Sequence, residues 1–375
     1  MFMRKVNQVS DFQTLKSVWN KLLDDNLLGS NVFLTWEWLS TWWKHFGAGK
    51  RLMILTVEDQ GAILAVAPLM FSEYEAPAFG HIGKIELVAA RDSDYNNFII
   101  LREDAAVVNS IVDYLKNNVQ GWDWIELKEI PASADKLNLM NMFSHDLSSN
   151  LTLKMNVCNS CPYLVLPVSI NLLMEKLSQK MRQNLMRRLR EIRKDYRVEL
   201  KRYDEAGYSV NQAMTFFARL NKARLSAQGM PGLLNEKYDH FRNFQDDVAE
   251  RFAEKGWLGL YFLMANDEPI SAEYAFEYSG KVYAYLSGFD PSYSKYSVGN
   301  LIVMLLLERL IKDGFSEYDM LRGDEPYKFE WTNTYRQNFE IRLVQRTLLS
   351  KYYDLITSNK FIVHLTSKMA HFTSH

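Results

Sequence analysis

The sequence predicts an α/β (α+β) protein with two domains, each built around a central sheet. The chain has 375 residues, of which 47% are hydrophobic, enough for two or three domains with substantial cores. Residues 51–71 and 257–278 share one pattern, an apolar strand, a short polar turn and a second strand. A helix, a glycine and another strand follow each hairpin, which indicates a loose duplication of one domain.

In the first half, the hairpin turns at 58–61, and a helix is predicted over 104–118. Gly121 ends that helix and the strand 122–127 follows. An additional stretch near 72–98 separates the hairpin from the helix and makes the repeat imperfect.

In the second half, the hairpin turns at 266–269 and a nearly all-apolar helix over 300–313 is expected to be buried against a sheet. Gly314 ends it and the strand 316–321 follows. The other predicted elements are a short helix and loop over 131–150, a strand at 197–200, helices over 208–227 and 235–255, and a final helix from 350 with a polar tail.

Composition excludes several classes of function. The net charge of −1 argues against a polyelectrolyte binder of nucleic acid. Neither a membrane-spanning apolar run nor a secretory signal is visible, so we expect a cytoplasmic location. Cys158 and Cys161 form an isolated C-x-x-C pair without further zinc ligands, and we expect no metal. The histidines are too scattered to support a Ser–His–Asp hydrolase.

The segment 318–331 is the strongest candidate for the floor of a site. It combines four acidic, two basic and four aromatic residues around one Gly and one Pro. Rings favour burial, whereas charges need partners or a ligand. An ordinary strand end closed by an Arg–carboxylate pair is the competing interpretation. Just upstream, Gly299 and Asn300 open the apolar helix, where unpaired backbone N–H groups create a potential anion site.

A second feature is the basic helix over 173–194. Leucine, methionine and isoleucine recur at helical spacing along its core face. The opposite face is cationic, which indicates a solvated face or a phosphate-binding one. The helix has no aromatic residue for base stacking, which favours a small phosphorylated ligand or an acidic partner over RNA. The basic residues are Lys176, Lys180, Arg182, Arg187, Arg188, Arg190, Arg193 and Lys194.

The run Leu321-Arg322-Gly323-Asp324-Glu325-Pro326-Tyr327-Lys328 with Trp331 closely resembles the C-terminal signature of the CelD-like (BcsL-like) branch of the GNAT acyltransferase superfamily. Weaker matches are Lys180-x-Arg182-x-Asn184-Leu185-x-Arg187-Arg188, Ser93-Asp94-Tyr95 and Tyr296-Ser297-x-Gly299. Together the matches span residues 30–345. The full Q/R-x-x-G-x-G/A motif is missing, and Val298 stands where related sequences often carry Pro.

This resemblance implies two tandem GNAT-like domains related to the Fem peptidyltransferases, each a mixed, mostly antiparallel sheet flanked by helices. We expect a degenerate N-terminal domain over 1–165, which shapes the acceptor side, a C-terminal acyltransferase domain over 166–349, and a helix and tail over 350–375. The implied co-substrate is acetyl-CoA or another acyl-CoA, with its pyrophosphate at Ser297, Gly299 and Asn300.

For acyl transfer to an amine, Glu273 is our first candidate for the base and Asp324 the second. The alternative for Glu273 is an exposed strand residue. Strands 270–278 and 281–288 are expected to splay and admit the pantetheine arm. Further catalytic candidates are Arg322 and Tyr327, and further cofactor-binding candidates are Tyr285 and Ser287. The substrate-binding candidates are Asp94, Tyr95, Arg182, Arg187, Glu325, Lys328 and Trp331.

The expected function is therefore N-acyl transfer to a small-molecule or envelope-precursor amine. The resemblance alone implies a link to the cell envelope or exopolysaccharides. One alternative is a Fem-like peptidyltransferase that uses aminoacyl-tRNA, although the long heptad-patterned helical pair often found in that group is not evident. The other is a non-catalytic GNAT-like binding module. No DNA partner is expected, and tRNA is expected only under the first alternative.

Overall fold

The computed structural model describes residues 1–25, 30–76, 80–101, 104–132, 151–230 and 239–346. The predicted helix and loop over 131–150 and the predicted C-terminal helix and tail fall largely or wholly outside these residues. The chain divides into two compact units. Unit 1 comprises residues 1–29, 47–158 and 339–375, and unit 2 comprises residues 30–46 and 159–338. Residues 30–46 and 159–165 thus belong to unit 2, whereas the sequence-based division grouped them with the first domain.

Unit 1 contains a mixed sheet in the order β1-β2-β3-β4-β6-β13, with β5 paired to β3. The strands are β1 (Phe2–Val6), β2 (Arg51–Asp59), β3 (Ala62–Ala76), β4 (Gly80–Leu87), β5 (Ile99–Ile100), β6 (Trp124–Pro131) and the part of β13 (Tyr335–Gln345) from residue 339 on. Neighbours from β1 to β4 are antiparallel, whereas β4 and β6 are parallel. The additional stretch of the sequence repeat thus contains β4, the fourth strand in this order.

Unit 1 has three helices among its described residues, α1 (Val9–Thr14), α2 (Lys16–Asp25) and α4 (Ala105–Asn118). The prediction of a helix over 104–118 is confirmed. Asp104 caps its N-terminus, because its side chain accepts a hydrogen bond from the Ala106 N–H at 2.8 Å. Ile111 and Leu115 of α4 pack into the core beneath β2 and β3.

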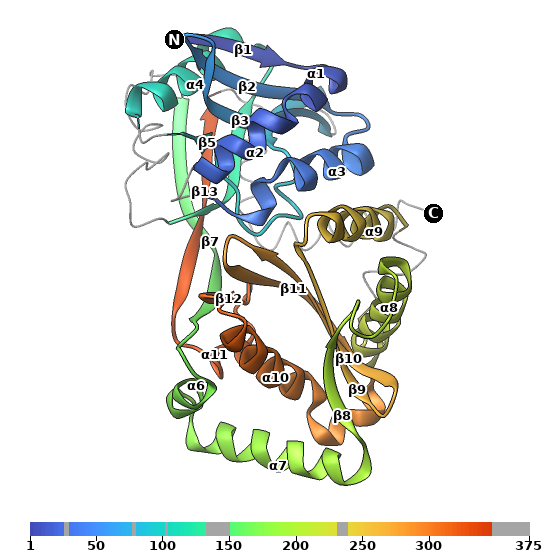
Figure 1. Ribbon diagram of the computed structural model, residues 1–375. Coiled ribbons are helices and arrows are strands. Elements are labelled where there is room, and N and C mark those ends of the chain that lie inside the picture. The colour runs from blue at the N-terminus through green and yellow to red at the C-terminus, as the bar shows by residue number, and fades with distance from the viewer. Residues whose placement is uncertain (26–29, 77–79, 102–103, 133–150, 231–238, 347–375) are drawn as a thin grey trace. The chain divides into compact units, whose positions relative to one another are not determined.

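Unit 2 repeats this topology in the order β8-β9-β10-β11-β12-β7 (Figure 1). Its strands are β8 (Val198–Arg202), β9 (Leu258–Ala265), β10 (Glu268–Tyr278), β11 (Lys281–Phe289), β12 (Glu317–Asp319) and the part of β7 (Leu151–Val165) from residue 159 on. Neighbouring strands in this order are antiparallel, except that β11 and β12 are parallel. Both units therefore have an antiparallel meander, a helix and a parallel strand, which confirms the predicted α/β fold built on mixed sheets flanked by helices.

The helices of unit 2 are α3 (Trp36–Phe46), α6 (Ile170–Lys176), α7 (Gln179–Asp195), α8 (Val210–Ala227), α9 (Asp239–Glu254), α10 (Val298–Lys312) and α11 (Pro326–Phe329), with 3₁₀ turns η1 (Val32–Leu34) and η3 (Pro291–Tyr296). Figure 1 shows α10 on one face of the sheet and α8 on the other. At Gly288, α8 approaches β11 so closely that a Cβ atom would lie 2.4 Å from the backbone nitrogen of Asn221.

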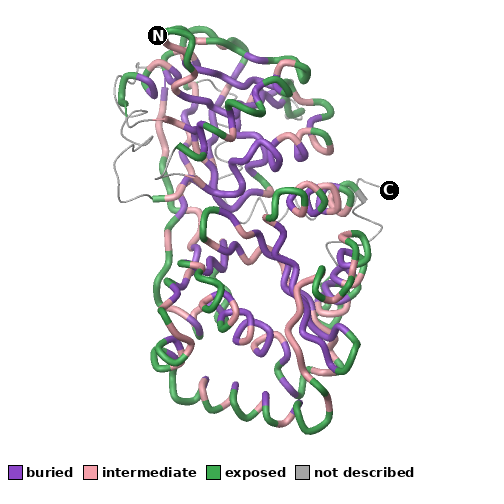
Figure 2. Tube along the Cα trace, viewed as in Figure 1, coloured by how far each residue is buried: buried purple, intermediate pink, exposed green. Residues whose placement is uncertain are grey.

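Helix α3 packs within unit 2 although it is distant from the rest of that unit in sequence. The Trp38 ring lies 5.1 Å from that of Phe244 and 5.7 Å from that of Phe276, both in edge-on arrangements. His45 Nε2 lies 2.7 Å from the Asp247 carboxylate of α9. The buried faces of the helices are visible in Figure 2. In the part of the chain that is described, no helix is long and apolar enough to cross a membrane.

Candidate active site

Glu273 lies on β10 with only 6% of its surface exposed, so the alternative of an exposed strand residue is wrong. The Tyr318 hydroxyl of β12 donates a hydrogen bond to Glu273 Oε1 at 3.2 Å. Burial raises the pKa of Glu273 to about 7, while the Tyr318 hydrogen bond and the charges of Arg224 and Lys328 act in the opposite direction. A carboxyl group with that pKa is suited to accept and release protons near neutral pH.

Lys328 stabilises the turn that follows β12 by donating hydrogen bonds to backbone carbonyl groups of that turn. Lys328 is 4% exposed, and its Nζ donates to the carbonyl oxygens of Leu321 at 3.3 Å and Arg322 at 2.7 Å. It also pairs with Glu325 Oε2 at 3.0 Å. Leu321 adopts a left-handed φ of 58°, and its N–H donates to Asp319 Oδ1 at 2.8 Å. Lys328 therefore fixes a strained turn beside Glu273, rather than projecting into solvent.

The strand that carries Tyr318 is held in place by Arg336. Its guanidinium pairs with Asp319 at 3.0 Å and with Glu317 at 2.5 Å, and it lies 3.6 Å from the centroid of the Tyr163 ring on β7. Two charge-assisted contacts from a planar guanidinium restrict the orientation of β12. Arg336 thus positions the strand from which Tyr318 reaches Glu273.

The start of α10 forms a second part of the site. Ser297 has a left-handed φ of 54° and makes no side-chain capping bond to the first helical turn. A Cβ atom at Gly299 would meet only the Phe289 ring, at 3.6 Å. Neither packing nor backbone conformation therefore requires glycine there, and its missing side chain keeps the helix N-terminus open to a ligand.

A pocket of about 140 Å³ joins this helix start to α7. Ser297 and Asn300 line it together with Asn184, Arg187 and Arg188. Arg188 Nη1 lies 2.9 Å from Glu191, and Arg187 lies 3.7 Å from the same carboxylate. Two guanidinium groups beside a helix N-terminus constitute an anion-binding arrangement.

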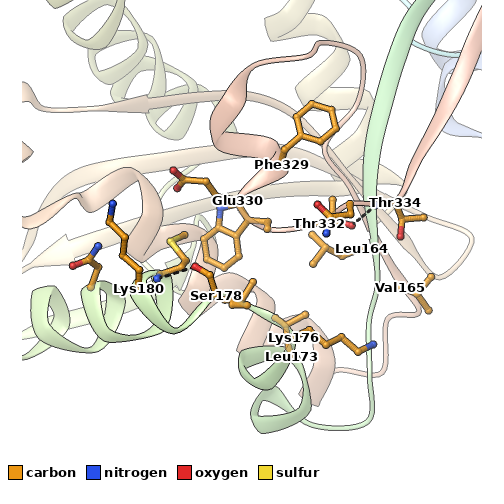
Figure 3. A pocket seen from close by; sticks show the side chains of 15 residues that line it. Leu164, Val165, Leu173, Lys176, Ser178, Lys180, Phe329, Glu330, Thr332 and Thr334 are labelled. Carbon is orange, nitrogen blue, oxygen red and sulfur yellow. Dashed lines mark hydrogen bonds between the residues drawn. The ribbon is translucent and has the colours of Figure 1, made fainter.

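A larger pocket of about 710 Å³ shares Met181, Asn184 and Glu330 with the small one. Figure 3 shows Lys176 and Lys180 at this pocket with Phe329 and Glu330. Trp331 also lines it and is 4% exposed, and its Nε1 has no hydrogen-bond partner in the described part of the chain.

The expected splay between strands 270–278 and 281–288 is wrong. β10 and β11 pair from Ser271 opposite Phe289 to Tyr278 opposite Lys281, with one irregularity near Tyr285. The divergence occurs instead between β11 and β12, whose parallel pairing covers only 281–283 and 317–319. A hairpin keeps its strands paired, whereas parallel strands joined by a helix are free to separate.

Several predicted residues have other surroundings. The Tyr285 ring lies 5.6 Å from that of Trp38 and 5.1 Å from that of Phe276, within an aromatic cluster. The Ser287 carbonyl accepts a hydrogen bond from Asn221 Nδ2 at 2.8 Å. Among the remaining candidates, Asp324 and Glu325 are exposed, and Tyr327 is 46% exposed. Arg182 and Arg322 are half-buried. Asp94 and Tyr95 are buried in unit 1.

Sequence reasoning missed Tyr318 and Arg224 as members of the site. Tyr318 lies at the start of the charged segment, but its partner Glu273 is on a strand that is not adjacent to β12. Arg224 is on α8, and its Nε is buried without a hydrogen-bond partner among the described residues. A lone arginine near a helix end carries no sequence signal of this kind.

Comparisons with known proteins support the fold. Residues 179–329 match a family model described as an acetyltransferase (GNAT) domain. The crystal structure of FemX is similar over 95% of this chain and 100% of its own, with a TM-score of 0.62 and 11% identity. The structure of L-PGS from Bacillus licheniformis is similar over 87% of this chain and 96% of its own, with a TM-score of 0.51 and 10% identity.

A conserved protein of unknown function from Bacteroides thetaiotaomicron is similar over 92% of this chain and 100% of its own, with a TM-score of 0.53 and 10% identity. No curated protein matches the sequence. At these identities the structural likeness concerns the fold alone. The CelD-like resemblance stays a prediction.

Proposed function

We propose that unit 2 transfers an acyl group from an activated donor to an amine, with Glu273 as the general base. The observation that carries this proposal is the buried Glu273 carboxyl group, whose pKa is raised to about 7. It belongs to the part of the chain that matches a GNAT acetyltransferase domain. An amine must lose a proton when it becomes an amide, and a carboxylate of this pKa accepts that proton at neutral pH.

In the proposed reaction, the amine nitrogen attacks the carbonyl carbon of a thioester. The C–N bond forms, the C–S bond breaks, and the thiolate leaves and takes up a proton. Glu273 accepts the proton that the amine loses. The Tyr318 hydroxyl orients the carboxylate through its hydrogen bond to Oε1.

Acyl-CoA is the donor we propose, and acetyl-CoA is the first to test. The start of α10 with Arg187 and Arg188 would hold its pyrophosphate, since this pocket combines a helix N-terminus with two guanidinium groups. The gap where β11 and β12 separate is the proposed path for the pantetheine arm. A cell-envelope or exopolysaccharide precursor as acceptor rests on the sequence resemblance alone.

The second candidate is transfer from aminoacyl-tRNA. It is favoured by the likeness to FemX, which extends over the whole length of that protein. The cationic surface of α7 also suits a polyanion. The chemistry at Glu273 would be unchanged, because an amine attacks an ester carbonyl in the same manner.

Calorimetric titration of the full chain with acetyl-CoA, longer acyl-CoAs and free CoA tests the donor. We expect micromolar binding that Gly299→Leu weakens at least tenfold, because leucine would obstruct the helix start. Gly314→Ala is not a suitable control, since Gly314 has a left-handed φ of 86°. Glu308→Gln on the exposed face of α10 serves as the control instead.

Binding of charged tRNA at physiological salt, without any CoA binding, would favour the second candidate. Failure of both would indicate a non-catalytic binding module.

A further inference from the structure

Exposed aliphatic side chains gather where β7 leads into α6. Val165 is 63% exposed, Val168 is 91% exposed and Leu172 is 43% exposed. Isolated exposed apolar residues are ordinary, but three within eight residues of one chain segment form a local apolar surface. None of the three belongs to the hydrophobic core of unit 2, in which Leu166 and Leu173 of the same segment are buried.

Cations border this apolar surface. Lys176 follows Leu172 at a spacing of four residues on α6, so both side chains lie on one face of the helix. Val165, Lys176 and Lys180 line the same pocket of about 710 Å³ (Figure 3). Val165, Val168, Leu172, Lys176 and Lys180 are called the α6 patch below.

The charge of the surrounding helices is strongly positive. Residues 170–195 contain eight lysine and arginine residues and three carboxylates. Among the described residues, Lys176 and Lys180 have no hydrogen-bond or ion-pair partner, and neither does Arg193. Exposed residues follow the outer side of α7 in Figure 2. Such a surface attracts an anionic partner over a distance of about a Debye length, roughly 8–10 Å at ordinary ionic strength.

The composition of the patch distinguishes a lipid surface from a nucleic acid. Residues 170–195 contain no aromatic side chain on which a base could stack. Exposed valine and leucine gain nothing from a phosphodiester backbone, whereas they are stabilised in the acyl boundary of a bilayer. The neighbouring pocket has walls of mixed polarity, in which Leu164, Leu177 and Phe329 lie beside the two lysines and polar residues such as Thr332 and Glu330. Two lysines next to exposed aliphatic side chains match the chemistry of an anionic phospholipid.

We propose that the α6 patch docks unit 2 on an anionic membrane surface. Val168 and Leu172 enter the boundary between headgroups and acyl chains, and Lys176 and Lys180 contact the lipid phosphates. This role is separate from acyl transfer at Glu273 and does not depend on the donor.

Cosedimentation of the full chain with vesicles tests the proposal. Vesicles of phosphatidylcholine with about a third phosphatidylglycerol are compared with vesicles of phosphatidylcholine alone. We expect binding to the anionic vesicles only, decreasing as salt rises. Lys176→Gln with Lys180→Gln is expected to lower the partition coefficient roughly 25-fold, since each cation near an anionic surface contributes about fivefold.

Val168→Ser with Leu172→Ser is expected to lower partition about tenfold without changing the charge. Matched controls in unit 1 are Lys5→Gln with Lys21→Gln, and Val18→Ser, all at exposed positions. Circular dichroism and thermal melting establish that each variant is folded. Absence of wild-type binding to anionic vesicles overturns the proposal, as does an equal loss in the controls. Binding of a short RNA duplex that the lysine variants abolish, with no vesicle binding, would assign the patch to nucleic acid.

Discussion

The Tyr318 hydroxyl reaches Glu273 across the strand that lies between them. Tyr318 is on β12 and Glu273 on β10, with β11 separating the two strands in the sheet, yet the hydroxyl lies 3.2 Å from Oε1. The contact depends on the short pairing of β11 with β12, which ends at Tyr283 and Asp319. Tyr318 lies within this short pairing, opposite Val282, and the end of the pairing is the path that we propose for the donor.

Glu273→Gln is expected to reduce kcat for acyl transfer by about 10²–10⁴-fold, the usual contribution of a positioned general base. The base must be deprotonated, so the wild-type rate should rise with pH through about 7. The variant should lack that rise. Stopped-flow or steady-state rates between pH 5 and 9 measure both effects, with Glu308→Gln as a control. A variant that retains the wild-type pH profile would exclude Glu273 as the base.

The same substitution is expected to stabilise the protein at high pH. The folded-state pKa of Glu273, about 7, lies above the ordinary value of 4.5 for a glutamate carboxyl group. The folded state thus binds more protons than the unfolded state between these values, and stability falls as pH rises through this window. Above pH 8, Glu273→Gln should raise the free energy of unfolding by about 3 kcal/mol. Below pH 4 the difference should vanish.

Urea unfolding at pH 4 and pH 8 tests this sign. Glutamine keeps an oxygen that accepts the Tyr318 hydrogen bond, so the comparison isolates the charge. Equal stability of the two proteins at both values of pH would mean that Glu273 is not desolvated as described.

Lys328→Met is expected to lower the free energy of unfolding by about 1–3 kcal/mol, the cost of leaving buried carbonyl groups without a donor. The substitution removes the hydrogen bonds to Leu321 and Arg322 and loosens the turn beside Glu273. The melting temperature and kcat of the variant should therefore both be lower than those of the wild type. Lys312→Met, at an exposed position on α10, should change stability by less than about 0.5 kcal/mol. Unchanged melting of Lys328→Met would argue against the anchoring role.

Much of this fold could be predicted because local patterns determine it. The hairpin turns and the helix of nearly continuous apolar residues from 300 are visible in local composition, and a glycine follows the end of that helix. Pairing between distant segments carries no such signal. No element was predicted over residues 36–46, and only the structure shows that α3 packs on α9 and β10.

In the candidate site, too, contacts between residues distant in sequence could not be predicted. Residue type and segment made Glu273 a candidate base and Lys328 a candidate for substrate binding, and both roles stay predictions. The contact of Glu273 with Tyr318 depends on strand order. Tyr285 was expected at the donor because it lies on the strand 281–288, which was predicted to border the pantetheine arm. Its ring instead packs against Phe33 and Trp38, which are distant in sequence. An amphipathic aromatic residue fits an apolar cluster as well as a ligand site, so its type alone did not decide between them.

Arg187→Ala with Arg188→Ala is expected to raise the Kd for CoA by at least tenfold, since hydrogen bonds to a charged group contribute about 1.5–3 kcal/mol each. Both guanidinium groups border the pocket at the start of α10, whereas Arg190 does not line it. Arg190→Ala is thus a control on the same helix, because each arginine-to-alanine substitution removes one positive charge. Titration of CoA and of inorganic pyrophosphate into each variant separates a local contact from a general field. If Arg190→Ala weakened binding as much per residue as the double variant, long-range attraction by α7 would account for the affinity, and the pocket would not be the pyrophosphate site.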